Sequence, residues 1–154
     1  MNHGFHHVAI ATQDIERAAD LYKDLPGYET VFKLNGDSGK QALDATTGRR
    51  APSARIVMLT CGNAVIKGLE YHTPQPRPDA AARAVCDHGL THLGPQVTDN
   101  NAAHTRLKAA GIPFHNDPRT VGGGLWATYG RGPDGNVVEL LVTPRDSALA
   151  VVAA

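Results

Sequence analysis

The stretch HVAIATQD, residues 7–14, returns later in the chain as HLGPQVTD, residues 92–99. In both copies a histidine precedes an aspartate by seven residues, a run with helical spacing follows, and a glycine ends that run. Two unrelated segments would rarely agree in so many features, and self-similarity of this kind shows how a chain is organised. The sequence therefore predicts two copies of one structural module.

Each copy opens with the pattern of a short strand that leads into a helix. Asp14 and Asp99 are well placed as N-caps, because their carboxylates can accept hydrogen bonds from the N–H groups of the first turn. The apolar residues that follow recur at helical spacing and predict one buried face on each helix. These faces are Ile15, Ala18, Ala19 and Tyr22 in the first copy and Ala102, Ala103, Leu107 and Ala110 in the second.

Three strands should follow each helix. In the first copy we expect them at residues 28–34, 54–60 and 64–71. In the second copy, strands at residues 125–129 and 137–143 flank the turn sequence GPDGN. The predicted organisation is one domain over residues 1–154, with a first module at 5–72, a linker at 73–86, a second module at 87–144 and a tail at 145–154.

Composition narrows the possible partners. Lys plus Arg number 15 and Asp plus Glu number 15, so the basic excess that nucleic acids or membrane surfaces call for is absent. No apolar run approaches the roughly 20 residues that span a bilayer. The N-terminus lacks the pattern of a signal peptide, and two cysteines do not suggest a disulfide scaffold. We expect a cytoplasmic protein that binds a small molecule.

Together with the closing sequence PDGNVVEL, residues 133–140, the paired modules resemble the vicinal oxygen chelate superfamily. That superfamily includes glyoxalase I, methylmalonyl-CoA epimerase, extradiol dioxygenases, fosfomycin-resistance enzymes and bleomycin-binding proteins. The resemblance implies an α+β fold in which two βαβββ modules form a cupped, incompletely closed eight-stranded sheet with the helices outside. It also implies a homodimer. It does not specify the reaction, because one scaffold hosts several chemistries.

The resemblance also implies where a metal would bind. Carried over by position, the ligands are His7, His92 and Glu139, and the position where relatives carry a fourth ligand, Glu or Gln, is occupied by Lys67. Glu70 could serve instead only if a bulge near Gly68 changed the alternation of side chains, because residues three apart on a strand face opposite sides. Otherwise Lys67 faces the cup and Glu70 faces away from it.

This set has two interpretations. His7, His92 and Glu139 could form a two-histidine, one-carboxylate triad around Fe, Mn, Ni or Zn. Alternatively, the ammonium of Lys67 pairs with Glu139 and occupies the place of the metal, since a cation beside a divalent ion repels it. The missing carboxylate disfavours glyoxalase I and epimerase chemistry, in which it serves as ligand and often as base.

Two classes of function follow. The first is an enzyme acting on an oxygenated, possibly aromatic metabolite with Lys67, Glu139 and His92 as catalytic residues. It would be a metal-dependent oxygenase or lyase, or a metal-free isomerase or cyclase. The second is a non-catalytic small-molecule or antibiotic binding protein of the bleomycin-binding type.

Further side chains are candidates for the pocket. We expect Trp126, Tyr129 and His88 to contact the substrate, although Trp126 and Tyr129 have opposite parity along one strand, so at most one of them faces the cup. The remaining histidines have no motif support, and we expect His104 and His115 among them to lie on the surface.

Overall fold

The computed structural model of this chain describes residues 4–25, 27–36, 45–76 and 83–151. The chain divides into two units: residues 1–23 and 27–78 form the first, and residues 24–26 and 79–154 form the second. Within the described ranges, no helix is long and apolar enough to cross a membrane.

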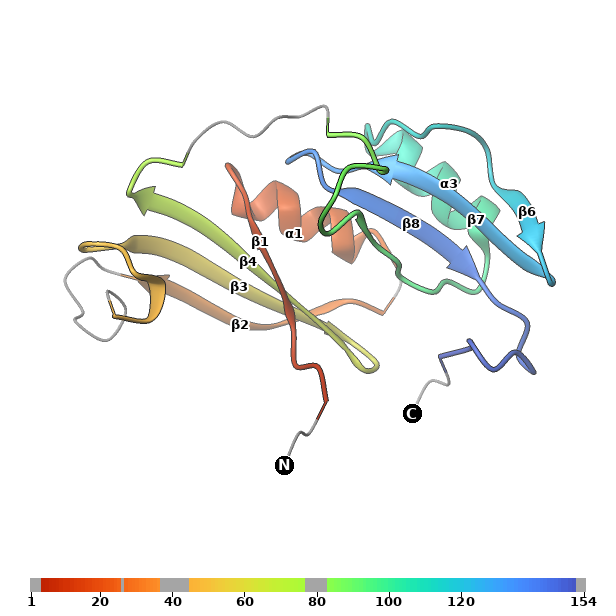
Figure 1. The fold of residues 1–154 in the computed structure, drawn as a ribbon, viewed down its shortest axis with the longest axis horizontal. Coiled ribbons are helices and arrows are strands. Elements are labelled where there is room, and N and C mark those ends of the chain that lie inside the picture. The colour runs from red at the N-terminus through yellow and green to blue at the C-terminus, as the bar shows by residue number, and fades with distance from the viewer. Residues whose placement is uncertain (1–3, 26, 37–44, 77–82, 152–154) are drawn as a thin grey trace. The chain divides into compact units, whose positions relative to one another are not determined.

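The first unit is a four-stranded sheet with one helix against it (Figure 1). Its elements are β1 (Val8–Ala11), α1 (Ile15–Lys23), β2 (Glu29–Gly36), β3 (Ser53–Cys61) and β4 (Ala64–Thr73). The strand order is β1-β4-β3-β2, with β1 parallel to β4 and the other pairs antiparallel.

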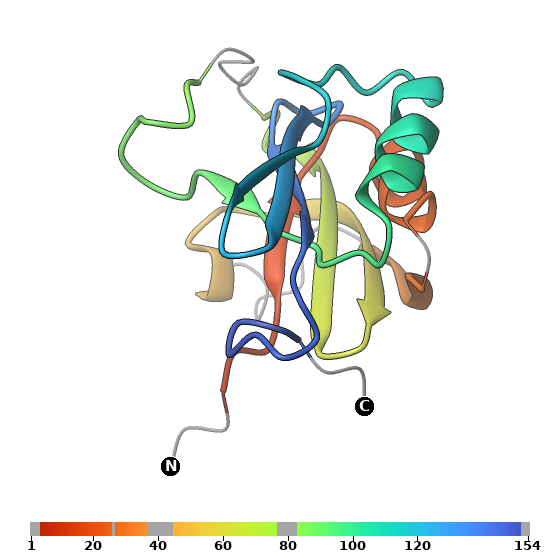
Figure 2. The same ribbon diagram turned by 90° about the vertical axis from the view of Figure 1, so that its right-hand side faces the viewer.

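The second unit repeats this topology. Its elements are β5 (His92–Leu93), α3 (Asn100–Ala109), β6 (Arg119–Gly122), β7 (Leu125–Arg131) and β8 (Val137–Val142). The order is β5-β8-β7-β6, again with only the first pair parallel, and α3 contacts β7 and β8 from one side of the sheet (Figure 2). The internal repeat and the α+β class with two βαβββ modules are therefore confirmed. The union of both sheets into one cup stays a prediction.

The helix starts follow from the predicted caps. Asp14 Oδ1 accepts hydrogen bonds from the N–H groups of Glu16 and Arg17 at 3.1 and 3.0 Å. Asp99 Oδ1 accepts one from Ala102 at 2.9 Å. These bonds satisfy N–H groups that have no partner inside the helix. The predicted apolar face of α1 is also confirmed, because Ile15, Ala18, Ala19 and Tyr22 are all buried.

The predicted face of α3 is wrong in part. Ala103 and Leu107 are buried, but Ala102 and Ala110 are exposed. Their places are taken by Asn100 and His104, which complete the spacing i, i+3, i+4, i+7 of a buried helical stripe. His104 was expected on the surface, and instead only 6% of it is exposed. Its ring packs edge-on against Phe114 with centroids 4.4 Å apart.

Candidate functional site

The second unit carries a group of polar side chains on the side of its sheet opposite α3, which is called the polar face below. Tyr129 on β7 and Glu139 on β8 are directly paired across the two strands. The next residue, Gly130, faces the other way, because a Cβ placed on it would meet Phe114 and Ile112, the residues that follow α3. Since side chains alternate along a strand, Tyr129 and Glu139 both project from the face that α3 does not cover.

His92 completes this face. Its Nε2 lies 3.2 Å from Glu139 Oε2, and the two side chains are 31% and 19% exposed. On the other side of the ring, Nδ1 lies 2.8 Å from the hydroxyl oxygen of Thr91. The centroids of the His92 and Tyr129 rings are 5.1 Å apart. The structure thus brings together two of the predicted catalytic residues, His92 and Glu139, with the predicted substrate-binding residue Tyr129.

The surroundings of Tyr129 change the pKa of its phenol. Burial raises its pKa above the usual value, and the negative charge of Glu139 raises it further. The phenol is therefore kept protonated and able to donate a hydrogen bond. An imidazole, a carboxylate and a phenol on one face are the groups that proteins use for general acid–base chemistry.

Trp126 and His88 lie apart from this cluster. Trp126 has the parity of Gly130 and so belongs to the α3 side of β7, where 43% of it is exposed. Of the two aromatic residues considered for the pocket, Tyr129 is the one on the polar face. His88 is exposed, and its backbone carbonyl accepts a hydrogen bond from the guanidinium of Arg83.

In the first unit, Lys67 lies on an apolar part of its sheet. It is paired with Ala9 on β1 and with Met58 on β3, and its neighbours on the same face of β4 are Val65 and Leu69. The residue is half-buried. Within the described part of the chain, no hydrogen bond or ion pair is found for its ammonium. An ammonium in such a setting is costly without an anionic partner.

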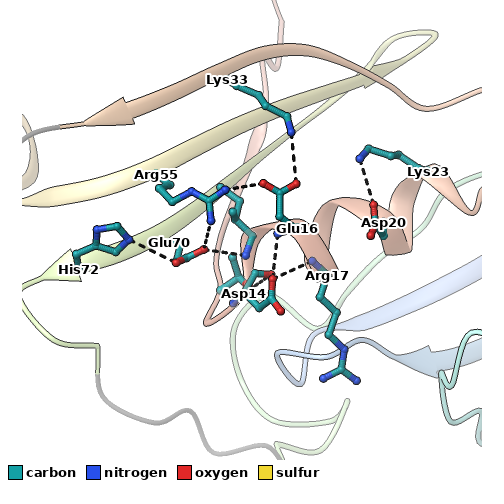
Figure 3. Close-up of polar contacts among 11 residues, drawn as sticks. Asp14, Glu16, Arg17, Asp20, Lys23, Lys33, Arg55, Glu70 and His72 are labelled. Carbon is teal, nitrogen blue, oxygen red and sulfur yellow. Dashed lines mark hydrogen bonds and ion pairs between the residues drawn. The ribbon is translucent and has the colours of Figure 1, made fainter.

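Glu70 belongs to the opposite face of β4. Its Oε2 accepts a hydrogen bond from the N–H of Ile15 at 3.0 Å and forms an ion pair with Nη1 of Arg55 at 3.3 Å (Figure 3). Its Oε1 lies 3.4 Å from Nε2 of His72. Arg55 also pairs with Glu16 at 2.5 Å. Glu70 therefore anchors the start of α1.

The bulge that would have turned Glu70 around is absent from the described strands. The pairing of β4 with β1 and β3 runs without a shift past Gly68. Gly68 instead permits close packing, since a Cβ on it would lie 2.8 Å from Val57 and 3.6 Å from Ile15. Lys67 and Glu70 therefore project from opposite faces of β4, and the assignment of Lys67 to the fourth ligand position stays a prediction.

These residues do not fit the four-ligand metal centre of the resemblance. His92 and Glu139 supply two ligand-type groups in one unit, but Lys67 supplies an ammonium, which cannot bind a metal. His7 directly precedes β1 and its Nδ1 lies 2.8 Å from Nδ1 of His6. Among the described residues, no three His, Cys, Asp or Glu side chains gather around one point. Two predictions combine residues of both units and stay predictions. They are the metal triad of His7, His92 and Glu139 and the ion pair of Lys67 with Glu139.

Comparison with known proteins points to one family. The model of the Glyoxalase/Bleomycin resistance protein/Dioxygenase superfamily matches residues 4–140. A protein named 2-epi-5-epi-valiolone epimerase, from Actinomyces sp, is 30% identical over 152 residues, covering 90% of this chain and 79% of the relative.

Solved structures show the same fold. A glyoxalase family protein from Bacillus cereus superposes with a TM-score of 0.85 at 18% identity, over 92% of this chain and 95% of the other. The fosfomycin resistance protein FosX from Listeria monocytogenes, crystallised with Mn(II) and sulfate, superposes with a TM-score of 0.59 at 14% identity, over 97% of this chain and 100% of the other.

Proposed function

Because the chain belongs to the glyoxalase/bleomycin resistance/dioxygenase superfamily, we propose that it is an isomerase that moves a proton on a small oxygenated molecule. The observation that carries the proposal is the contact of His92 with Glu139 at 3.2 Å, with Tyr129 beside both on one sheet face. Sequestration of a ligand does not require a carboxylate, an imidazole and a phenol in mutual contact. Proton transfer uses all three.

The proposed step is the removal of a proton from a carbon beside a carbonyl group. Glu139, oriented by His92, takes the proton, and the electron pair of the broken C–H bond moves onto the carbonyl oxygen. The phenol of Tyr129 donates a hydrogen bond to the oxyanion. Return of a proton to the same carbon from the opposite face re-forms the carbonyl and inverts that carbon. In an α-hydroxy ketone the proton can instead return to the former carbonyl carbon: the oxyanion takes up a proton, the neighbouring hydroxyl loses one, and the carbonyl moves by one position. Neither outcome consumes an oxidant or a co-reactant.

For Lys67 the proposal concerns the first unit alone: its half-buried ammonium, on an apolar part of the sheet, binds an anionic oxygen of a ligand. Divalent metals provide such positive charge in many enzymes, and the ammonium stands at the position where the resemblance puts a fourth metal ligand. The apolar neighbours of Lys67 supply no counter-charge. A negatively charged oxygen of a ligand would supply one.

This proposal revises the expectation that disfavours epimerase chemistry. That expectation rests on the carboxylate missing at Lys67, which serves as a metal ligand and often as the base. His92 and Glu139 offer a base without that carboxylate, and the relative with 30% identity is named an epimerase. We therefore take a cyclic hydroxy ketone, of the kind that the relative's name denotes, as the first substrate class to test.

The experiment is proton NMR of 2-epi-5-epi-valiolone with the protein in D2O. We expect the signal of the proton beside the ketone to disappear as deuterium replaces it. Glu139→Gln should slow the exchange by about 10²–10⁴-fold, the usual contribution of a positioned base. Glu29→Gln, which changes an exposed carboxylate on β2, is the matched control and should exchange at the wild-type rate. Exchange that is equally fast in Glu139→Gln would refute the proposed base.

Small-molecule binding without chemistry is the second candidate. The observation that favours it is the apolar surrounding of Lys67, which suits an apolar ligand with one anionic group. In that case an apolar carboxylic acid would bind, no proton of 2-epi-5-epi-valiolone would exchange, and Glu139→Gln would leave the affinity for the acid unchanged.

A further inference from the structure

The polar face of the second unit continues beyond the end of β5 to Gln96, which forms an isolated parallel bridge with Leu141 on β8. His92 is paired with Val137, and Gln96 is paired with Leu141, so the same register holds at both ends of this stretch. Side chains two residues apart on a strand share a face. Gln96 therefore projects from the same face as His92. Gly94 between them lies close to Glu139, whose Oε2 would be 3.4 Å from a Cβ at that position.

The side chain of Gln96 holds the C-terminal tail, which we define as residues 145–151. The N–H of Val151 donates a hydrogen bond to Gln96 Oε1 at 2.9 Å, and Gln96 Nε2 donates one to the carbonyl oxygen of Val151 at 3.3 Å. The hydroxyl of Thr143 donates a third bond to Oε1 at 2.8 Å. The amide of Gln96 therefore binds both backbone polar groups of Val151, as the backbone of a neighbouring strand would.

The tail reaches Gln96 by turning back after β8. The N–H of Ser147 donates to the carbonyl oxygen of Pro144, and the N–H of Ala150 donates to that of Ser147, both at 3.0 Å. Figure 1 shows this segment in dark blue, folding back beyond the end of β8. Because Gln96 projects from the polar face, the backbone bound to its amide lies at the end of that face where β8 finishes.

We propose that the C-terminal tail is a strap, held by Gln96, that closes one end of the polar face and limits the length of the substrate. Leu141, the partner of Gln96, is two residues from Glu139, which corresponds to about 6.6 Å along a strand. The strap therefore stands a short distance from the proposed base. The inference rests on the proposed function and adds a limit on the substrate. The part of the substrate that lies toward Gln96 must be short enough to fit between Glu139 and the strap.

Two substitutions, one on each side of the contact, should release the strap. Gln96→Ala removes the amide, and Val151→Pro removes the N–H that donates to it. Gln75→Ala is the matched control, because the Gln75 side chain makes one exposed hydrogen bond, to the carbonyl oxygen of His72. Hydrogen–deuterium exchange of the C-terminal peptide should be at least roughly tenfold faster in both strap variants and unchanged in the control.

The consequence for substrates is measured by binding, which does not depend on turnover. The probes are 2-hydroxycyclohexanone and derivatives with one, two and three added methylene groups, titrated by saturation-transfer NMR. We expect the wild type to bind the longest probe at least roughly tenfold more weakly than the shortest, as in other size-limited pockets. Gln96→Ala and Val151→Pro should reduce that ratio to near unity, whereas Gln75→Ala should keep it.

The outcomes separate the strap from the proposed function. Faster exchange in the tail with an unchanged length ratio overturns the strap and leaves the proposed function standing. A length ratio that depends on Gln96, in a protein that exchanges no substrate proton, supports the strap and counts against the isomerase. Unchanged exchange in the tail of both strap variants, or binding of no probe by any of the four proteins, overturns the strap.

Discussion

Tyr129 and Glu139 are directly opposite one another on β7 and β8, so a phenol and a carboxylate share the face that also carries His92. Cross-strand partners are the closest neighbours in a sheet. The negative charge of Glu139 therefore acts on the Tyr129 phenol and contributes to its raised pKa.

This contact lets us predict how the pKa of Tyr129 changes when Glu139 is replaced by a neutral residue. Glu139→Gln removes the negative charge, so the pKa of Tyr129 should fall. It should stay above the ordinary value of a tyrosine, because burial is the larger cause of the shift. Ultraviolet titration of the tyrosinate absorption would measure this, with Tyr129→Phe identifying the signal. Glu29→Gln should leave the titration unchanged, and a fall of the same size in that variant would contradict the explanation.

The raised pKa of Tyr28 lets us predict how the stability of the first unit depends on pH. Burial raises the pKa of Tyr28 to about 12, with a smaller contribution from the Cys61 thiolate. The folded state then holds the proton more tightly than the unfolded state, in which the pKa is near 10. The stabilisation is present below pH 10 and is lost as the pH rises toward 12. Tyr28→Phe should unfold less steeply with pH across that window, as thermal melts at several pH values would show.

Local patterns predicted the parts of the fold that depend on neighbours in sequence. The capping aspartates and the apolar stripe of α1 are set by spacing within a few residues, and they are confirmed. The stripe of α3 was predicted less well, because Asn100 and His104 are buried by distant partners. Asn100 Nδ2 donates a hydrogen bond to the carbonyl oxygen of Leu140, and His104 packs on Phe114. Nothing in the helix sequence indicates those contacts.

Two other features had no local signal at all. All four residues of β6 are exposed, so this strand lacks the alternation of apolar and polar residues by which strands are recognised in a sequence. The pairing of β6 with β7 places it. The contact of Gln96 with Val151 joins residues 55 apart, and its partner atoms belong to the backbone, whose hydrogen bonds a side-chain pattern does not predict. His92 and Glu139 were predicted from the resemblance to the superfamily and Tyr129 as a pocket residue, and the structure added that the three share a face.

Glu70 provides a test of the face assignment in β4. Glu70→Ala removes the acceptor for the N–H of Ile15 and a partner of Arg55. We expect a loss of about 1–2 kcal/mol in the free energy of unfolding, measured by urea denaturation. Ligand binding and proton exchange should persist in the folded protein, because Glu70 projects toward α1. A stable protein that has lost ligand binding would place Glu70 on the functional face instead.

Lys67 provides the corresponding test on the other face. Lys67→Glu would restore the two-histidine, two-carboxylate set that the resemblance implies, and it would remove a positive charge that repels a divalent ion. We expect the variant to bind Ni²⁺ or Zn²⁺ at least roughly tenfold more tightly than the wild type, a difference of about 1.4 kcal/mol. Calorimetric titration would measure the affinities, and elemental analysis of both purified proteins would measure the metal that they retain.

The control is Lys108→Glu, which makes the same change of charge at an exposed position on α3 and should leave the metal affinity as in the wild type. A gain in both variants would mean that net charge, and not a new ligand, attracts the metal. Equal and negligible binding by the wild type and Lys67→Glu would mean that Lys67 does not meet His92 and Glu139. Stoichiometric iron held tightly by the wild type would favour the triad of His7, His92 and Glu139, and with it oxygenase chemistry in place of the isomerase proposed here.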